Sequence, residues 1–159
     1  MAQHWYPPQP RVRAFVDAAL DWHHSTLRRG AATYVFVRYI APLRTGKPVG
    51  PGGEKTAKDA LSLLRDALSQ LNSYWLQPGR RFLAGGEVSI ADLVLACEVS
   101  QLALLDAAAD APLKMGDLLE PHAAVRSWLA DTRAATQPHW DAVHTRLHAA
   151  AGARASAKL

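Results

Sequence analysis

Apolar residues recur at intervals of three and four along almost the whole chain, and this spacing constrains the fold more than any other feature. It is the spacing of helices with one buried face, whereas half-buried strands would alternate apolar and polar residues. We find no sustained alternation. A length of 159 residues fits one domain with a sizeable core. The sequence therefore predicts an all-α bundle of about five helices, at roughly residues 11–40, 54–76, from 89 onward, 121–134 and 138–150.

Proline and glycine mark the limits of the first two helices. Pro42 is predicted to end the first one, because proline lacks a backbone N–H and clashes with the preceding turn. Residues 41–53 hold three prolines and four glycines, a composition typical of a loop. The second helix carries a narrow apolar seam for one neighbouring helix, formed by Ala57, Leu61, Leu64, Leu68, Leu71 and Trp75.

The start of the third helix carries two capping signals. Ser89, with Asp92 three residues later, predicts a capping box, in which the two residues satisfy each other's free backbone N–H groups. Val88 and Leu93 fit the hydrophobic staple that fixes the direction in which the chain enters a helix. We therefore expect Ser89 and Asp92 to have a structural role rather than a chemical one.

Charge and hydropathy indicate which partners to expect. The net charge is +4, and only Arg28–Arg29 and Arg80–Arg81 are adjacent basic pairs. Nucleic-acid surfaces usually concentrate their Lys and Arg residues on one face. No apolar run approaches the ~18 residues of a membrane span. We therefore expect neither nucleic acid nor a membrane as a partner.

The histidines and the single cysteine do not form a recognisable metal or nucleophile motif. His23 and His24 are adjacent in a helix, point about 100° apart and cannot share a metal. His144 and His148 are four residues apart, as helical zinc ligands are, but no third ligand has a fixed spacing. Cys97 follows an apolar stretch and is expected to be buried and unreactive. We predict no metal site.

Arg28, Ala32, Phe36 and Ile40 follow one another at steps of four in the first helix. Residues at this spacing share one slowly drifting face, so a cation would lie beside a small, an aromatic and an aliphatic surface. Such a face suits the wall of an apolar pocket with a charge at its mouth. From spacing alone, the commoner arrangement is packing in the core, with the Arg28 guanidinium reaching out to water.

Several strings of residues resemble the C-terminal helical domain of theta-class glutathione S-transferases, most closely the plant-type members. The string Trp22–Ala32, with its Trp-x-His-x-x-Leu-Arg-Arg core, resembles this class specifically. Ser89-Ile90-Ala91-Asp92 is shared by glutathione transferases in general. The other strings that carry the resemblance are His4-Trp5-Tyr6-Pro7, Phe82-Leu83-Ala84-Gly85, Val125-x-x-Trp128, the stretch from Ala134 to Trp140, and His144.

The resemblance implies a function for the stripe of residues Arg28, Ala32, Phe36 and Ile40 in the first helix. In this family that helix walls the pocket for the apolar electrophile, and the matching positions are His23, Arg28, Ala32, Phe36 and Ile40. Arg28 corresponds to an arginine near the glutathione and the electrophile, where a cation favours the thiolate. We expect it to be an electrostatic helper and expect no catalytic residue in this chain. Glutathione would be the co-substrate and small apolar electrophiles the substrates, for thioether formation or peroxide reduction in detoxification.

The same resemblance implies that a second domain takes part. Family members hold glutathione and ionise its thiol with a serine of an N-terminal thioredoxin-like domain, and this chain has no strand–helix–strand pattern. Residues 1–10 resemble the linker that precedes the helical domain, residues 11–150. We expect the chain alone to be inactive and the full enzyme to be a homodimer. The alternative is a non-catalytic protein-interaction module of the same fold.

Residues 151–159 are predicted to form a flexible, alanine-rich tail. The chain ends in Ala157-Lys158-Leu159, which has the small–basic–leucine form of a peroxisomal address. Arg154 lies just upstream of this tripeptide. We therefore expect either a cytoplasmic or a peroxisomal location.

Overall fold

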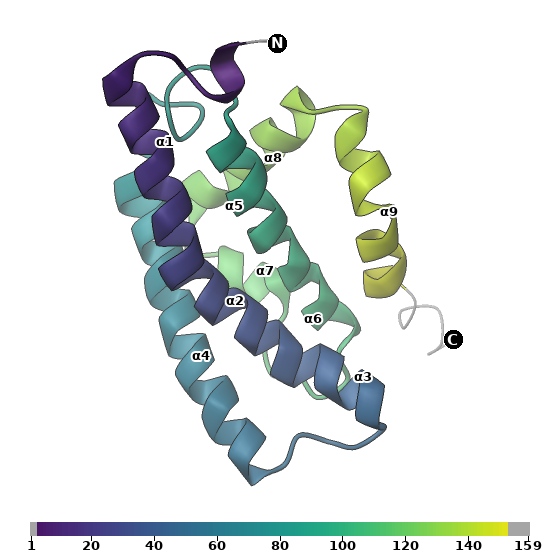
Figure 1. Ribbon diagram of the computed structural model, residues 1–159. Coiled ribbons are helices and arrows are strands. Elements are labelled where there is room, and N and C mark those ends of the chain that lie inside the picture. Colours follow the sequence, from purple (N-terminus) through teal and green to yellow (C-terminus); the bar gives the residue numbers. More distant parts are fainter. Residues whose placement is uncertain (1–2, 153–159) are drawn as a thin grey trace.

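The computed structural model describes residues 3–152, which form an all-α bundle and confirm the predicted fold class (Figure 1). The first long helix consists of α1 (Pro10–Trp22), α2 (Arg28–Val35) and α3 (Ala41–Thr45), joined by π-helical turns at His23–Leu27 and Phe36–Ile40. A short 3-10 turn, Gln3–Trp5, precedes it. The other helices are α4 (Pro51–Gln70, continued by a π-helical turn at Leu71–Trp75), α5 (Ile90–Ser100), α6 (Leu104–Ala107), α7 (Met115–Leu119), α8 (Ala123–Ala135) and α9 (His139–Gly152).

The first helix does not end at Pro42 as the sequence predicted, but continues to Thr45. The reason is the π-helical turn Phe36–Ile40, in which the Ala41 N–H donates to the Phe36 carbonyl five residues earlier. This wider turn comes directly before the proline, so Pro42 lies in the first turn of α3, where no backbone N–H is needed. Gly46, with a φ of 65°, ends the helix in the left-handed conformation that glycine adopts without strain.

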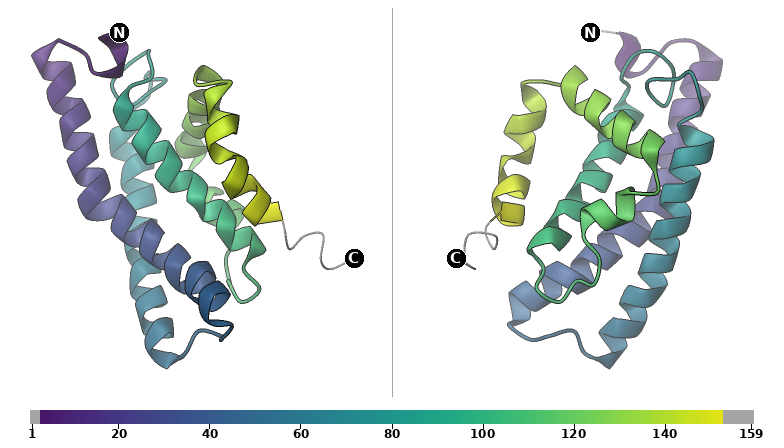
Figure 2. Two further views of the ribbon diagram at one scale, coloured as in Figure 1. Left: turned by 45° about the vertical axis from the view of Figure 1, so that its right-hand side comes forward. Right: turned by 180° about the vertical axis from the view of Figure 1, so that it is seen from behind.

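The two long helices lie side by side along the bundle, and Gly30 allows them to approach closely (Figures 1 and 2). A Cβ atom on Gly30 would lie 2.6 Å from the Leu64 backbone nitrogen and 2.8 Å from its Cα. Since backbone atoms cannot turn away, any side chain at residue 30 would force α2 and α4 apart. The seam of α4 faces this contact, with Ala57, Leu64, Leu68 and Leu71 fully buried.

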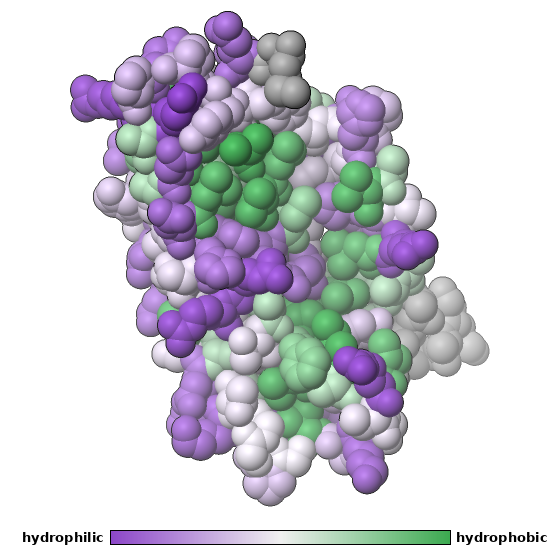
Figure 3. Space-filling view, in the orientation of Figure 1, coloured by the Kyte–Doolittle hydropathy of each residue, from purple (hydrophilic) through white to green (hydrophobic). Residues whose placement is uncertain are grey.

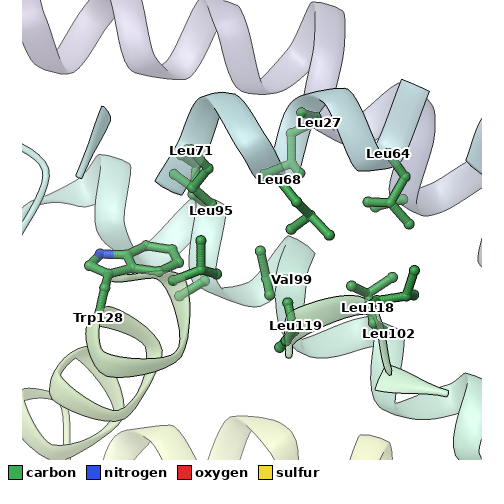
Figure 4. Packing of buried hydrophobic residues seen from close by; sticks show 14 of the residues in the cluster. Leu27, Leu64, Leu68, Leu71, Leu95, Val99, Leu102, Leu118, Leu119 and Trp128 are labelled. Carbon is green, nitrogen blue, oxygen red and sulfur yellow. The ribbon is translucent and has the colours of Figure 1, made fainter. Parts of the chain in front are cut away.

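The core lies between α4, α5 and α8. Figure 4 shows leucines of α4 directed toward Leu95 and Val99 of α5, with Trp128 of α8 closing one end. Leu95 and Val99 have no exposed surface, and Trp128 is 2% exposed. Because α5 lies within the bundle, its residues contact the first long helix on one side and α8 on the other. This central position makes α5 the scaffold of the candidate site.

Asp92 fixes the start of α5. Its Oδ1 accepts hydrogen bonds from the Leu83 N–H at 2.9 Å and the Trp128 Nε1–H at 2.8 Å. Its Oδ2 accepts from the Ser89 N–H at 2.8 Å and the Ser89 hydroxyl at 2.7 Å. The structure thus places Ser89 and Asp92 in a capping box and adds links to α8 and to the loop before α5. All four donors meet on a carboxylate with no exposed surface.

The later helices begin close to their predicted starts. Pro121 and Pro138 lie just before α8 and α9, which begin at Ala123 and His139. Among residues 3–152, no helix combines the length and the apolar character that a membrane crossing requires. The tripeptide Ala157-Lys158-Leu159 lies outside the described residues, so its predicted role as an address stays a prediction.

Candidate functional site

A pocket of about 430 Å³ lies between α5 and the π-helical turn that joins α1 to α2. Its walls combine apolar, charged and amide side chains in a small space. From the first helix come His23 and Arg28; from α5 and the residue that follows it come Leu93, Val94, Cys97, Glu98 and Gln101. The steps of three and four residues along this segment keep these side chains on one face of the helix.

Glu98 organises the polar side of this pocket. Its carboxylate is buried, with 5% of the side chain exposed. Its Oε2 lies 3.0 Å from His23 Nε2 and 3.6 Å from Arg28 Nη1, and its Oε1 accepts a hydrogen bond from the Gln101 amide. A buried carboxylate is stable only with partners of this kind, because burial disfavours its charged form. The three side chains are therefore held around one anion.

Arg28 forms the boundary between this cluster and water. Its side chain is 58% exposed, whereas that of His23, on the same helix, is 7% exposed. Glu98 engages one nitrogen of the guanidinium, and the group has five N–H donors in all. Arg28 is thus oriented from within the protein and keeps donors for an anion at the pocket mouth.

Cys97 is exposed in this pocket, so the prediction that it is buried is wrong. The apolar run before it indicated a buried helix, but α5 turns residues 94 and 97 toward the pocket and buries residues 95 and 96 instead. Its thiol is still held in the protonated form. Partial desolvation, and secondarily the negative charge of Glu98, raise the pKa of Cys97.

The structure brings together only two of the five predicted pocket residues. His23 and Arg28 line the pocket around Glu98, whereas Ala32, Phe36 and Ile40 lie farther along the helix and outside it. None of these three is buried, and Phe36 is 47% exposed. They form a continuation of the same surface rather than part of the enclosed volume.

Glu98 and Gln101 were missed by the sequence reasoning, although one signal was available. Glu98 is the only charged residue of α5 after its first turn, in a helix otherwise made of apolar and small residues. A carboxylate in such a helix needs a buried partner or a functional reason. His23 supplies that partner from a position 75 residues earlier in the chain, and no spacing rule connects the two positions.

An exposed apolar patch adjoins the pocket. Figure 3 shows apolar side chains gathered over α1 and the first half of α5. Ile90 and Leu93 are partly exposed there and Val94 is 39% exposed. An exposed apolar patch of this kind marks a contact with another molecule or domain.

Within residues 3–152, no group of three or more His, Cys, Asp or Glu side chains is placed to hold a metal ion. His144 and His148 do lie near each other, with ring centroids 6.1 Å apart. However, the His144 ring stacks on Trp140 and its Nδ1 lies 2.8 Å from the Trp140 carbonyl oxygen. The geometry of His144 is that of a packed helix side chain.

Residues 49–131, which include α4, α5 and most of α8, match the family of the glutathione S-transferase C-terminal domain. The chain belongs to this family. Glutathione S-transferase T1 of Arabidopsis thaliana is 42% identical over 91% of this chain, and glutathione S-transferase T2 of the same plant is 43% identical over the same share. The matched regions make up 56% of T1 and 23% of T2. This glutathione S-transferase domain thus spans little more than half of T1, and its theta-class affiliation is confirmed.

Solved structures agree with the sequence comparison. Human glutathione S-transferase T1-1 superimposes with a TM-score of 0.78 at 28% identity, over 95% of this chain and 58% of the human one. A human theta-class transferase in complex with the glutathione conjugate of 1-menaphthyl sulfate gives a TM-score of 0.70 at 25% identity, again over 95% and 58%. The helical bundle is therefore that of a theta-class C-terminal domain.

Proposed function

We propose that this domain forms the electrophile side of a glutathione transferase active site, with the pocket around Arg28 at its centre. The observation that carries the proposal is the exposed Arg28 guanidinium, oriented by the buried Glu98 beside an apolar surface. A cation at this place favours the thiolate form of a bound thiol and the charge that develops during its attack on an electrophile. Apolar walls suit the body of a small electrophile.

Glutathione and the thiol-activating group belong, in this proposal, to a thioredoxin-like domain on the patch that contains Ile90, Leu93 and Val94. That patch borders the pocket, so a domain covering it would place a bound thiol near Arg28. The match covers 56% of Arabidopsis glutathione S-transferase T1, and the rest of that protein is long enough to form such a domain. Positioning supplies most of the rate in a reaction between two bound molecules, and the isolated chain should therefore have no useful activity.

The test joins this chain to the part of Arabidopsis glutathione S-transferase T1 that lies outside the match. Conjugation of glutathione to 1-menaphthyl sulfate, whose conjugate a human theta-class relative binds, is then measured. We expect turnover from the joined protein and none from the 159-residue chain alone. Arg28→Ala should lower kcat/KM by about tenfold or more, as expected for a lost electrostatic contact in the transition state.

Arg29→Ala is the matched control. Arg29 is the neighbouring arginine on the same helix; it is exposed and does not line the pocket. We expect unchanged turnover from this variant and unchanged circular dichroism from both. Equal losses at the two positions, or none at Arg28, would contradict the proposed role of Arg28.

The homodimer and the cytoplasmic or peroxisomal location stay predictions. Tight binding of a protein partner by the chain alone, combined with an inactive joined enzyme, would instead support the interaction module.

A further inference from the structure

Two arginines of the first long helix pair with glutamates in different ways. The Arg38 guanidinium forms a bidentate pair with Glu54, with nitrogen–oxygen distances of 2.7 and 2.8 Å. This is a frequent arrangement of an arginine beside a carboxylate. Arg28 lies beside the carboxylate of Glu98, yet its Nη1 stays 3.6 Å from Oε2, which is too far for a hydrogen bond. The Arg28 guanidinium is therefore attracted by Glu98 without giving up its N–H donors.

The other partners of Glu98 explain this difference. Its Oε2 lies 3.0 Å from His23 Nε2, and its Oε1 accepts a hydrogen bond from the Gln101 amide. An ionised carboxylate only accepts hydrogen bonds, so the imidazole donates from Nε2. Glu54, in contrast, accepts side-chain hydrogen bonds only from Arg38 among the residues that the structure describes. Each oxygen of Glu98 thus has a hydrogen-bond donor other than Arg28.

The π-helical turn His23–Leu27 brings His23 to this position. In a regular α-helix, residues five apart point about 140° away from each other. Here the Arg28 N–H donates to the His23 carbonyl five residues earlier, which closes one wide turn. The two side chains lie on the same side of the helix and reach the same oxygen of Glu98. Single π-helical turns of this kind are frequent at functional sites.

We propose that His23 is a positioning residue of the transferase site. By donating to Glu98, it keeps the Arg28 guanidinium free to face a thiolate or another anionic group at the pocket mouth. Without this donor, the buried carboxylate would draw Arg28 into a bidentate pair, because burial penalises a charge that lacks partners. His23 thus acts through Glu98 rather than by touching the substrate. The inference rests on the proposed function, which gives Arg28 its role.

Modification of the 159-residue chain by phenylglyoxal, followed by mass spectrometry, measures how free Arg28 is. Phenylglyoxal adds to guanidinium groups, and a bidentate ion pair slows this reaction. Arg29 is the next residue and is exposed, so its rate is the internal reference. His23→Leu should slow the modification of Arg28 by about two- to fivefold, the range for a surface ion pair, and leave Arg29 unchanged.

Three further variants separate positioning from packing. His23→Gln restores an N–H donor at a similar reach and should return the Arg28 rate to that of the parent chain. Glu98→Gln, added to His23→Leu, removes the charge that captures Arg28, so the rate should rise at least to the parent value. A role of His23 in packing alone predicts neither recovery. His24→Leu should change nothing, because His24 is exposed on the same turn and does not line the pocket.

The joined enzyme gives a second readout. His23→Leu should lower kcat/KM for the conjugation of glutathione to 1-menaphthyl sulfate by about two- to fivefold, and His23→Gln should recover it. An unchanged Arg28 rate in a folded His23→Leu chain would overturn the inference, as would equal slowing by His24→Leu. Circular dichroism of each variant establishes that it is folded.

The inference and the proposed function can fail separately, since the modification of the chain requires no turnover. A joined enzyme that depends on Arg28 but not on His23 would overturn the inference alone. An inactive joined enzyme would overturn the proposed function, while a response of the Arg28 rate to His23→Leu would still support the coupling of His23 to Arg28.

Discussion

Two carboxylates on α5, Asp92 and Glu98, are both buried and yet have different roles. The donors around Asp92 are two backbone N–H groups, an indole N–H and the hydroxyl of Ser89. The partners of Glu98 are His23, Arg28 and Gln101, all of them side chains. A backbone or indole N–H can only donate a hydrogen bond. An imidazole nitrogen can instead accept one in the other tautomer, and an amide group can rotate to present its oxygen. The kind of donor, rather than burial, separates the fixed end of α5 from its adaptable middle.

The sharpest test compares Asp92→Asn with Glu98→Gln, since each replaces one carboxylate oxygen by an amide NH₂. At Asp92 the new NH₂ would face at least one fixed N–H, whichever oxygen it replaces, and we expect a loss of about 3 kcal/mol or more in the free energy of unfolding. At Glu98 the His23 ring can accept from the amide, so we expect a loss of only about 1 kcal/mol. Urea unfolding of the two variants and the parent measures both.

Equal losses in the free energy of unfolding would show that the two carboxylates do not differ in the way proposed. A large loss for Glu98→Gln alone would show that the middle of α5 is the fixed part.

Trp128→Phe tests one donor of the Asp92 network. It removes the Nε1–H that donates to Asp92 at 2.8 Å, inside the core, and should cost about 1–2 kcal/mol. Trp22→Phe is its counterpart, because the Trp22 Nε1–H donates to the exposed Gln70 amide at 3.0 Å. We expect less than about 0.5 kcal/mol there, since water replaces the lost partner. Thermal or urea unfolding with similar losses for both would argue against a special role of the buried carboxylate.

The alkylation rate of Cys97 tests how close its thiol lies to Glu98, and this is the smallest of the expected effects. Desolvation and then Glu98 raise the pKa of this thiol, so its thiolate fraction at pH 8 is lower than that of an ordinary cysteine. Removing the charge in Glu98→Gln lowers that pKa, and alkylation by iodoacetamide should become faster by less than about tenfold. Mass spectrometry follows the rate, and Cys97→Ser supplies the unlabelled control. A slower reaction in Glu98→Gln would contradict the placement of the two groups.

Local sequence rules located most of the helices correctly. The apolar seam of α4 and the Ser89–Asp92 pair depend on neighbours within a few residues, so spacing alone identified them. Pro42 was misjudged because the rule for proline assumes a regular α-helix, and a π-helical turn precedes it here. Cys97 was misjudged because an apolar run does not indicate which face of a central helix is exposed to solvent.

The candidate site was predicted only in part, for a related reason. Arg28 stood out through the family resemblance, but Glu98, which orients it, lies 70 positions later in the chain. The three stripe residues beyond Arg28 share its helix but not its pocket, because the wall opposite is provided by α5. The apolar periodicity of a sequence shows which residues share a face of one helix, whereas this pocket is formed by residues of two helices.

The sequence by itself determined the helical class, the α4 seam, the cap of α5 and, through resemblance, the theta-class family. These depend on contacts within one helix or on long matching strings. Only the tertiary structure decided that Asp92 accepts a hydrogen bond from Trp128 of α8, and that Glu98 brings His23, Arg28 and Gln101 together. Each of these joins residues far apart in the chain, and such contacts form only when the helices pack around a common core.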